Sequence, residues 1–171
     1  MKQEESRPGD GASASPEELA LINKLSRRAL TAQEVYVFSL TLCDNEVDRD
    51  FERFTVEALR EMAPMFVGKT GIFDHSMKGR DQIARIFECH VERMEGAVTS
   101  TGEAYHRLRA KAYLPRTARN EDIILEIDAG IKKEVSVGCS MGERRCSVCG
   151  ADLRAGSCSH VRGRRYSKDG R

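Results

Sequence analysis

Apolar residues recur at helical spacing in three stretches of the chain. The first begins at SPEE, residues 15–18, where a serine, a proline and a glutamate three places after the serine predict a capped helix start, and it extends to about residue 29. The second covers residues 55–64 and is expected to end at Pro64, because proline does not continue a helix. The third, ARNEDIILEIDAG, ends at Gly130, a residue type favoured just after a helix.

Runs of β-branched and aromatic residues predict strands between and after these helices. They are EVYVFSLTL (34–42), GKTGIFDHS (68–76), QIARIFECHVERM (82–94), EAYHRLRAKAYL (103–114) and, directly after Gly130, EVSVGCS (134–140). Antiparallel strands with a few helices around them predict an α+β fold, built on a small, mostly antiparallel β-barrel or sandwich with flanking helices.

Composition limits the chain to one main domain and excludes some classes of protein. The length of 171 residues suits a single domain, and residues 1–14 lack apolar periodicity, which predicts a disordered N-terminal arm. The net charge of +1 gives no reason to expect nucleic acid or an anionic membrane as a partner. No apolar run approaches the roughly 20 residues that span a bilayer, and the N-terminus does not resemble a signal peptide.

An acidic loop follows the first predicted strand. Asp44, Glu46, Asp48 and Asp50 alternate like the start of a calcium loop, but Arg49 and, later, Thr55 stand where such a loop requires a glycine and a bidentate glutamate. We therefore expect a solvated turn with local charge pairs to Arg49 and Arg53.

Three cysteines and a histidine lie at metal-binding spacing near the end of the chain. The pattern is Cys146-x2-Cys149-x8-Cys158-x-His160, and Gly150 follows the first pair as in a knuckle. The alternative, four unrelated reduced residues, requires three cysteines to cluster by chance. Four protein ligands leave no open position for water, so the pattern predicts a structural zinc site, in a zinc-knuckle insertion over residues 146–166.

Ser136 and His75 form a second candidate site. Both fall on or at the end of predicted strands, and a serine hydroxyl becomes a nucleophile when an imidazole within hydrogen-bond reach takes its proton. The backbone N–H groups of Gly138 and Cys139 are candidates to stabilise an oxyanion. Spacing alone favours a simpler interpretation, in which Ser136 is a strand residue and His75 a loop residue.

The order of several motifs resembles the capsid-maturation (prohead) proteases of tailed phages, whose fold is similar to that of herpesvirus assemblin. The resemblance covers about residues 16–166. It is carried by GIFDHS, then QIARIFECHVERM, then a strand with alternating basic residues, a helix and GIKKEVSVGCS. A subset of that family also shares LCDNEVDRDFERF, FVGKTGIFDHS and the CSVCG…CSH knuckle. The resemblance implies a protease-like domain over residues 15–145.

The same resemblance implies a function and a setting. His75 would be the general base and Ser136 the nucleophile of a serine endopeptidase that processes scaffold and the major capsid protein during prohead maturation. The protein would act in the host cytoplasm, inside the phage prohead, with a homodimer as one arrangement, and with neither membrane nor nucleic acid as a partner.

The third catalytic residue is where the chain departs from that family. The family places it on a strand after the serine strand, in a segment ending in a Pro-Ala pair, and no such segment precedes Arg171. We expect residues 167–171 to be a tail truncated before that strand. His160 lies at a suitable distance along the chain but is interpreted as a zinc ligand, and His90 and His106 are interpreted as surface residues.

Two other functions stay open at this stage. A non-catalytic capsid-assembly or scaffold-type protein would keep the protease fold and the zinc knuckle. A zinc-ribbon nucleic-acid binder would leave residues 35–140 unexplained. The remaining cysteines, Cys43, Cys89 and Cys139, are expected to be small core residues.

Overall fold

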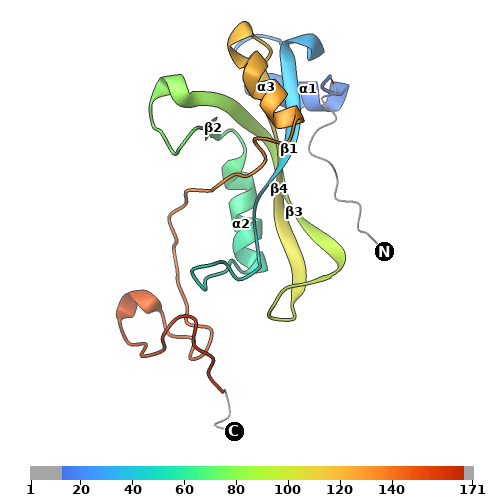
Figure 1. The fold of residues 1–171 in the computed structure, drawn as a ribbon. Helices are drawn as coiled ribbons and strands as arrows, with labels where there is room; N and C mark the ends of the chain where they lie inside the picture. Colours follow the sequence, from blue (N-terminus) through green and yellow to red (C-terminus); the bar gives the residue numbers. More distant parts are fainter. Residues whose placement is uncertain (1–12, 168–171) are drawn as a thin grey trace.

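A computed structural model describes residues 13–167, and the expected arm and tail fall almost entirely outside this range. One antiparallel sheet is the centre of the fold, with strand order β1-β4-β3-β2 (Figure 1). Its strands are β1 (Val35–Asp44), β2 (Thr70–Ile72), β3 (Gln82–Val98) and β4 (Ala104–Pro115). The helices are α1 (Pro16–Asn23), α2 (Val56–Phe66) and α3 (Glu121–Asp128). Short 3-10 turns cover Ala32–Glu34, Gly79–Asp81, Ala118–Asn120 and Leu153–Ala155.

The predicted α+β class with an antiparallel sheet is confirmed, but the sheet is open. β1 and β2 are its two edges, so within residues 13–167 it closes into neither a barrel nor a sandwich. None of the described helices is long and apolar enough to cross a membrane.

Helices cover both faces of the sheet. Successive side chains of a strand point to opposite faces, and β1 divides its apolar residues in this way. Val35 and Val37 pack with α1, whereas Leu42 packs with α2 and Tyr36 packs with α3. The apolar core therefore has two layers, and α2 and α3 share one face of β1.

Two helix ends differ from the predicted ones for local reasons. The capping box at Ser15 and Glu18 is present, but α1 ends at Asn23, whose side chain accepts from the Leu30 N–H (2.8 Å) and donates to the Leu30 carbonyl. These bonds replace the next helical turns with a closed loop. Pro64 lies inside α2 instead of ending it. It removes one helical hydrogen bond near the end of the helix, and Phe66, two residues later, still packs on the core.

The end of α3 follows the prediction. Gly130 adopts a φ of +71°, and the N–H groups of Gly130 and Ile131 donate to the carbonyls of Ile127 (3.0 Å) and Glu126 (2.8 Å). This pair of bonds is the Schellman arrangement, which ends a helix and turns the chain away from it.

The strand predicted at residues 134–140 is wrong. Residues 131–145 contain no regular secondary structure, and residues 133–143 form no backbone–backbone hydrogen bond with the described part of the chain. We call residues 131–145 the serine segment. Its partly buried Val137 packs against the apolar cluster that includes Leu59 of α2.

The acidic loop between β1 and α2 is not a turn with only local charge pairs. Arg53 binds Glu103, at the start of the β3–β4 hairpin's second strand, through two nitrogen–oxygen contacts of 2.5 and 2.7 Å. Glu46 accepts hydrogen bonds from Ser100 in the same hairpin. The loop is therefore fixed to a distant part of the fold.

Candidate functional site

His75 lies in a braced turn just after β2, as the sequence predicts. Asp74 and His75 have φ angles of +50° and +54°, a left-handed conformation that is uncommon for residues other than glycine. The turn is held by the Ser76 N–H, which donates to the Phe73 carbonyl (2.8 Å), and by the Ser76 hydroxyl, which donates to Asp81 (2.5 Å). The turn therefore places His75 at an exposed position next to the sheet edge.

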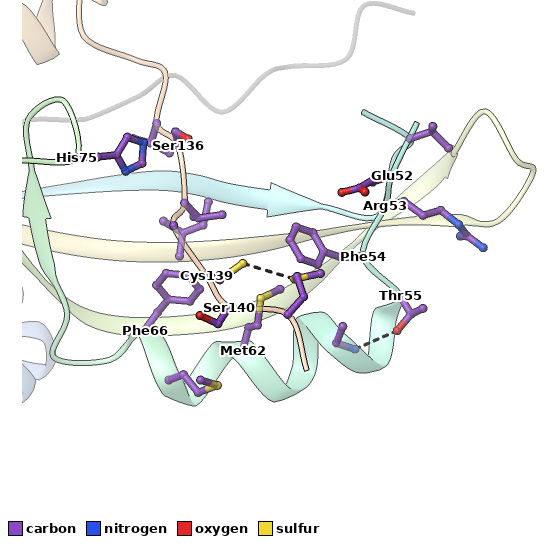
Figure 2. Close-up of a pocket in the computed structure, with 18 of the residues that line it drawn as sticks. Glu52, Arg53, Phe54, Thr55, Met62, Phe66, His75, Ser136, Cys139 and Ser140 are labelled. Carbon is purple, nitrogen blue, oxygen red and sulfur yellow. Dashed lines mark hydrogen bonds between the residues drawn. The ribbon is translucent and has the colours of Figure 1, made fainter. Parts of the chain in front are cut away.

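The structure brings His75 next to the segment that carries Ser136. Figure 2 shows the imidazole pointing toward the serine segment where it passes the end of β2. A Cβ added at Gly138 would lie 3.8 Å from His75 Nδ1. Within residues 13–167, no hydrogen bond joins His75 to Ser136 or to a carboxylate. His75 therefore lies beside the segment that carries Ser136, without a bonded third group.

Both residues line one large groove, of about 2370 Å³. The groove runs between β1, α2 and the serine segment, and it continues along the Cys/His region. Its apolar lining includes Phe38, Phe54, Met62 and Phe66. A groove of this size has room for an extended polypeptide beside His75 and Ser136.

The other cysteines divide into buried and exposed groups. Cys43 and Cys89 pack against the core, as predicted, and burial raises the pKa of their thiols to about 12 and about 11. Cys139 is exposed, so the prediction that it is a core residue is wrong. Val137 takes the core contact in its place.

The remaining histidines on strands have partners elsewhere. His90, on β3, is exposed and lies 3.5 Å from Glu88, and His106, on β4, lies 2.9 Å from the Ala104 carbonyl through Nδ1. Neither orients His75.

Cys146, Cys149, Cys158 and His160 lie together and could hold a metal ion. Their candidate ligand atoms all fall within 4.8 Å of one another. Cys149 Sγ is 3.7 Å from Cys158 Sγ, and Cys158 Sγ is 3.5 Å from His160 Nδ1. A tetrahedral zinc ion with bonds of about 2.3 Å to sulfur and about 2.0 Å to nitrogen places two sulfurs roughly 3.8 Å apart, and sulfur and nitrogen roughly 3.5 Å apart. The observed spacings fit such an ion.

The backbone around Cys146 is arranged for a thiolate. A short hairpin is closed by the Cys146 N–H, which donates to Ala151, and by the Gly150 N–H, which donates to Cys146, both at 2.9 Å. Gly150 has a φ of +73°, which explains the glycine after the first cysteine pair. Hydrogen bonds from the N–H groups of Cys149 and Val148 lower the pKa of the Cys146 thiol to about 6. We call residues 146–166 the metal module.

His160 belongs to this cluster and is also supported from outside it. Its ring meets the edge of Tyr166, with ring centroids 4.6 Å apart, and the Tyr166 hydroxyl accepts from the Val161 N–H (2.9 Å). These contacts of Tyr166 help to hold the His160 ring beside the cysteines.

Sequence reasoning missed Glu52, which accepts a hydrogen bond from Arg144 and forms an ion pair with Arg162. These two arginines flank the candidate metal ligands. No local signal identifies Glu52, because its partners lie far along the chain. Comparison of the chain with models of protein families, with curated proteins and with solved structures found no significant match.

Proposed function

We propose that this protein is a serine endopeptidase of the phage prohead type, with Ser136 as the nucleophile and His75 as its general base. The observation that carries the proposal is that His75 lies against the segment that carries Ser136, within 3.8 Å of a Cβ added at Gly138, although the two come from parts of the sequence far apart. Serine needs an imidazole neighbour to lose its proton during attack on a carbonyl. The order of motifs supports the same class of enzyme.

In this proposal each residue has a defined task. Ser136 Oγ attacks the carbonyl carbon of a substrate peptide bond while His75 takes the hydroxyl proton, and His75 then returns the proton to the leaving amine. The groove beside them would receive an extended segment of scaffold or capsid protein. A non-catalytic assembly protein is the alternative outcome of the test below.

The test compares the processing of a cognate capsid protein co-expressed with the wild-type chain, with Ser136→Ala or with Ser140→Ala. Ser140 is an exposed serine on the same segment and serves as the matched control. We expect Ser136→Ala to reduce the rate of cleavage by about 10⁴-fold or more, since removal of a serine nucleophile leaves only residual catalysis, and Ser140→Ala to leave it intact. A processing pattern that Ser136→Ala does not change would overturn the proposal and favour the assembly role.

We propose further that zinc is the metal of the Cys/His cluster. The donor set of three sulfurs and one nitrogen, and spacings that fit a tetrahedron, support this choice. Four protein ligands give the ion a structural role. Metal analysis of the purified protein should find about one zinc per chain, and a Cys149→Ser variant should have less. A chain that carries another metal, or none, would contradict the assignment.

A further inference from the structure

The serine segment depends on its ends for its position. It has no ladder of backbone hydrogen bonds to the sheet, and most of its side chains, including Ser136, are exposed. Its partly buried residue Val137 packs against the apolar core. Fifteen residues can extend about 50 Å, so a segment attached at one end only would have many paths open to it. Whatever holds the two ends therefore determines whether Ser136 stays beside His75.

The first end is anchored close to His75. The Schellman turn fixes Ile131 and Lys132 against α3 through bonds to Glu126. The Lys132 ammonium lies 5.4 Å from the centre of the Phe73 ring, two residues before His75. The start of the segment is thereby held against the turn that carries the histidine.

The second end is anchored through the metal module. Arg144, two residues before the first cysteine ligand, and Arg162, two residues after the histidine ligand, both contact the same Glu52 oxygen, with Arg162 at 2.7 Å. Glu52 belongs to the loop between β1 and α2, which is fixed to the β3–β4 hairpin through Arg53. One carboxylate thus joins both flanks of the metal module to the sheet.

Apolar and backbone contacts lie beside this carboxylate. Gly163 has a φ of +74° and lies against Phe51, where an added Cβ would come within 2.8 Å of a ring carbon. Inside the module, Arg154 donates to the Met141 carbonyl of the serine segment. The module is therefore linked to the loop on one side and to the serine segment on the other.

We propose that Glu52 is a positioning residue, which docks the metal module on the β1–α2 loop and so keeps the serine segment stretched past His75. The consequence for catalysis rests on the proposed function, whereas the docking itself does not. Glu52 and its two partners are each more than a third exposed, and exposed ion pairs are individually weak. Replacing two attractions by two repulsions is accordingly a sharper test than simple removal of the carboxylate.

The experiment uses Glu52→Lys in the full chain with zinc bound, and Glu57→Lys as a matched control on the exposed side of α2. Backbone ¹⁵N relaxation measures whether the module tumbles with the sheet. We expect amide order parameters over residues 146–166 to fall from about 0.85 to below about 0.6 in Glu52→Lys, with zinc content unchanged. Nuclear Overhauser contacts between the Val137 methyl groups and α2 should weaken in the same variant.

A rescue variant and an active-site probe complete the design. Glu52→Lys combined with Arg144→Glu and Arg162→Glu reverses both ion pairs and should restore rigid docking. If Glu52→Lys acted only by destabilising the loop, the two further substitutions would not restore docking. Labelling of Ser136 by a fluorophosphonate should slow in Glu52→Lys by about tenfold or more, the scale expected when reacting groups lose their alignment. Gly163→Ala places a methyl group against the Phe51 ring without altering charge, and this steric clash should undock the module as well.

The outcomes separate the docking from the proposed enzyme. Order parameters that stay high in Glu52→Lys would overturn the inference, and so would a detached module with unchanged Val137 contacts. A wild-type chain that resists the fluorophosphonate, yet shows the expected relaxation changes, would instead count against the serine protease and leave the docking role intact.

Discussion

Asn45 shows how one buried side chain can set the position of a loop. It is fully buried at the end of β1, where its side-chain oxygen accepts from the His106 N–H (2.8 Å) and its amide donates to the Ala104 carbonyl (3.0 Å). These bonds fasten the start of the β1–α2 loop to β4. The loop then carries Glu52, so the effect of Asn45 extends to the metal module.

Removing the Asn45 amide should destabilise the fold. Asn45→Ala leaves the His106 N–H without its acceptor and removes one of the two side chains that contact the Ala104 carbonyl. An unsatisfied group of this kind costs about 1–3 kcal/mol. Asn45→Asp keeps the acceptor for His106 but places an oxygen against the Ala104 carbonyl, so it should also destabilise. Urea unfolding of the purified protein measures the free energy of unfolding. A change below about 0.5 kcal/mol, the usual effect of a surface substitution, would mean that water replaces the lost partners.

At the level of elements, the sequence predicts best what neighbouring residues determine. The capping box of α1, the glycine after α3 and the long strands β3 and β4 each have their cause within a few positions. Helix ends were misjudged where a side chain offered an alternative, as Asn23 does at the end of α1. Pro64 does not end α2, and the helix continues to Phe66, whose contact with the core is made far along the chain from the proline's local signal.

The serine segment and the two candidate sites differ in how far local sequence predicts them. Valines around Ser136 satisfy strand propensity, but a strand also needs a partner edge, which depends on the whole sheet. The Cys/His cluster was predictable because its ligands lie within 15 residues of one another. The resemblance to a protease family pairs His75 with Ser136, because no sequence feature near either residue indicates that β2 and the segment after α3 meet. Glu52 had neither kind of signal.

At the scale of the whole molecule, the metal module lies outside the apolar core of the sheet. The three apolar core clusters extend along the chain no further than Val137, and none of them contains a residue of the module. All described α-helices and sheet strands end by Asp128. The module joins the rest mainly through Glu52 and the Phe51 contact.

Removing the metal should therefore unfold the module and leave the sheet intact. A polar, glycine-containing loop without its ion lacks the buried apolar area that offsets conformational entropy, so its folding free energy is the free energy of metal binding. Treatment with a chelator should abolish hydrogen-exchange protection over residues 146–166, while amides of β4, the central strand paired on both sides, keep theirs. Cys146→Ser should reproduce the chelated state without a chelator, and Cys43→Ser, outside the cluster, should not.

The serine segment would lose its second anchor when the metal is removed, so the contacts of Val137 with α2 should weaken as they do in Glu52→Lys. Loss of protection in β4 on chelation would show instead that the module and the sheet fold as one unit, because an ion that stabilises only the module cannot protect a strand outside it.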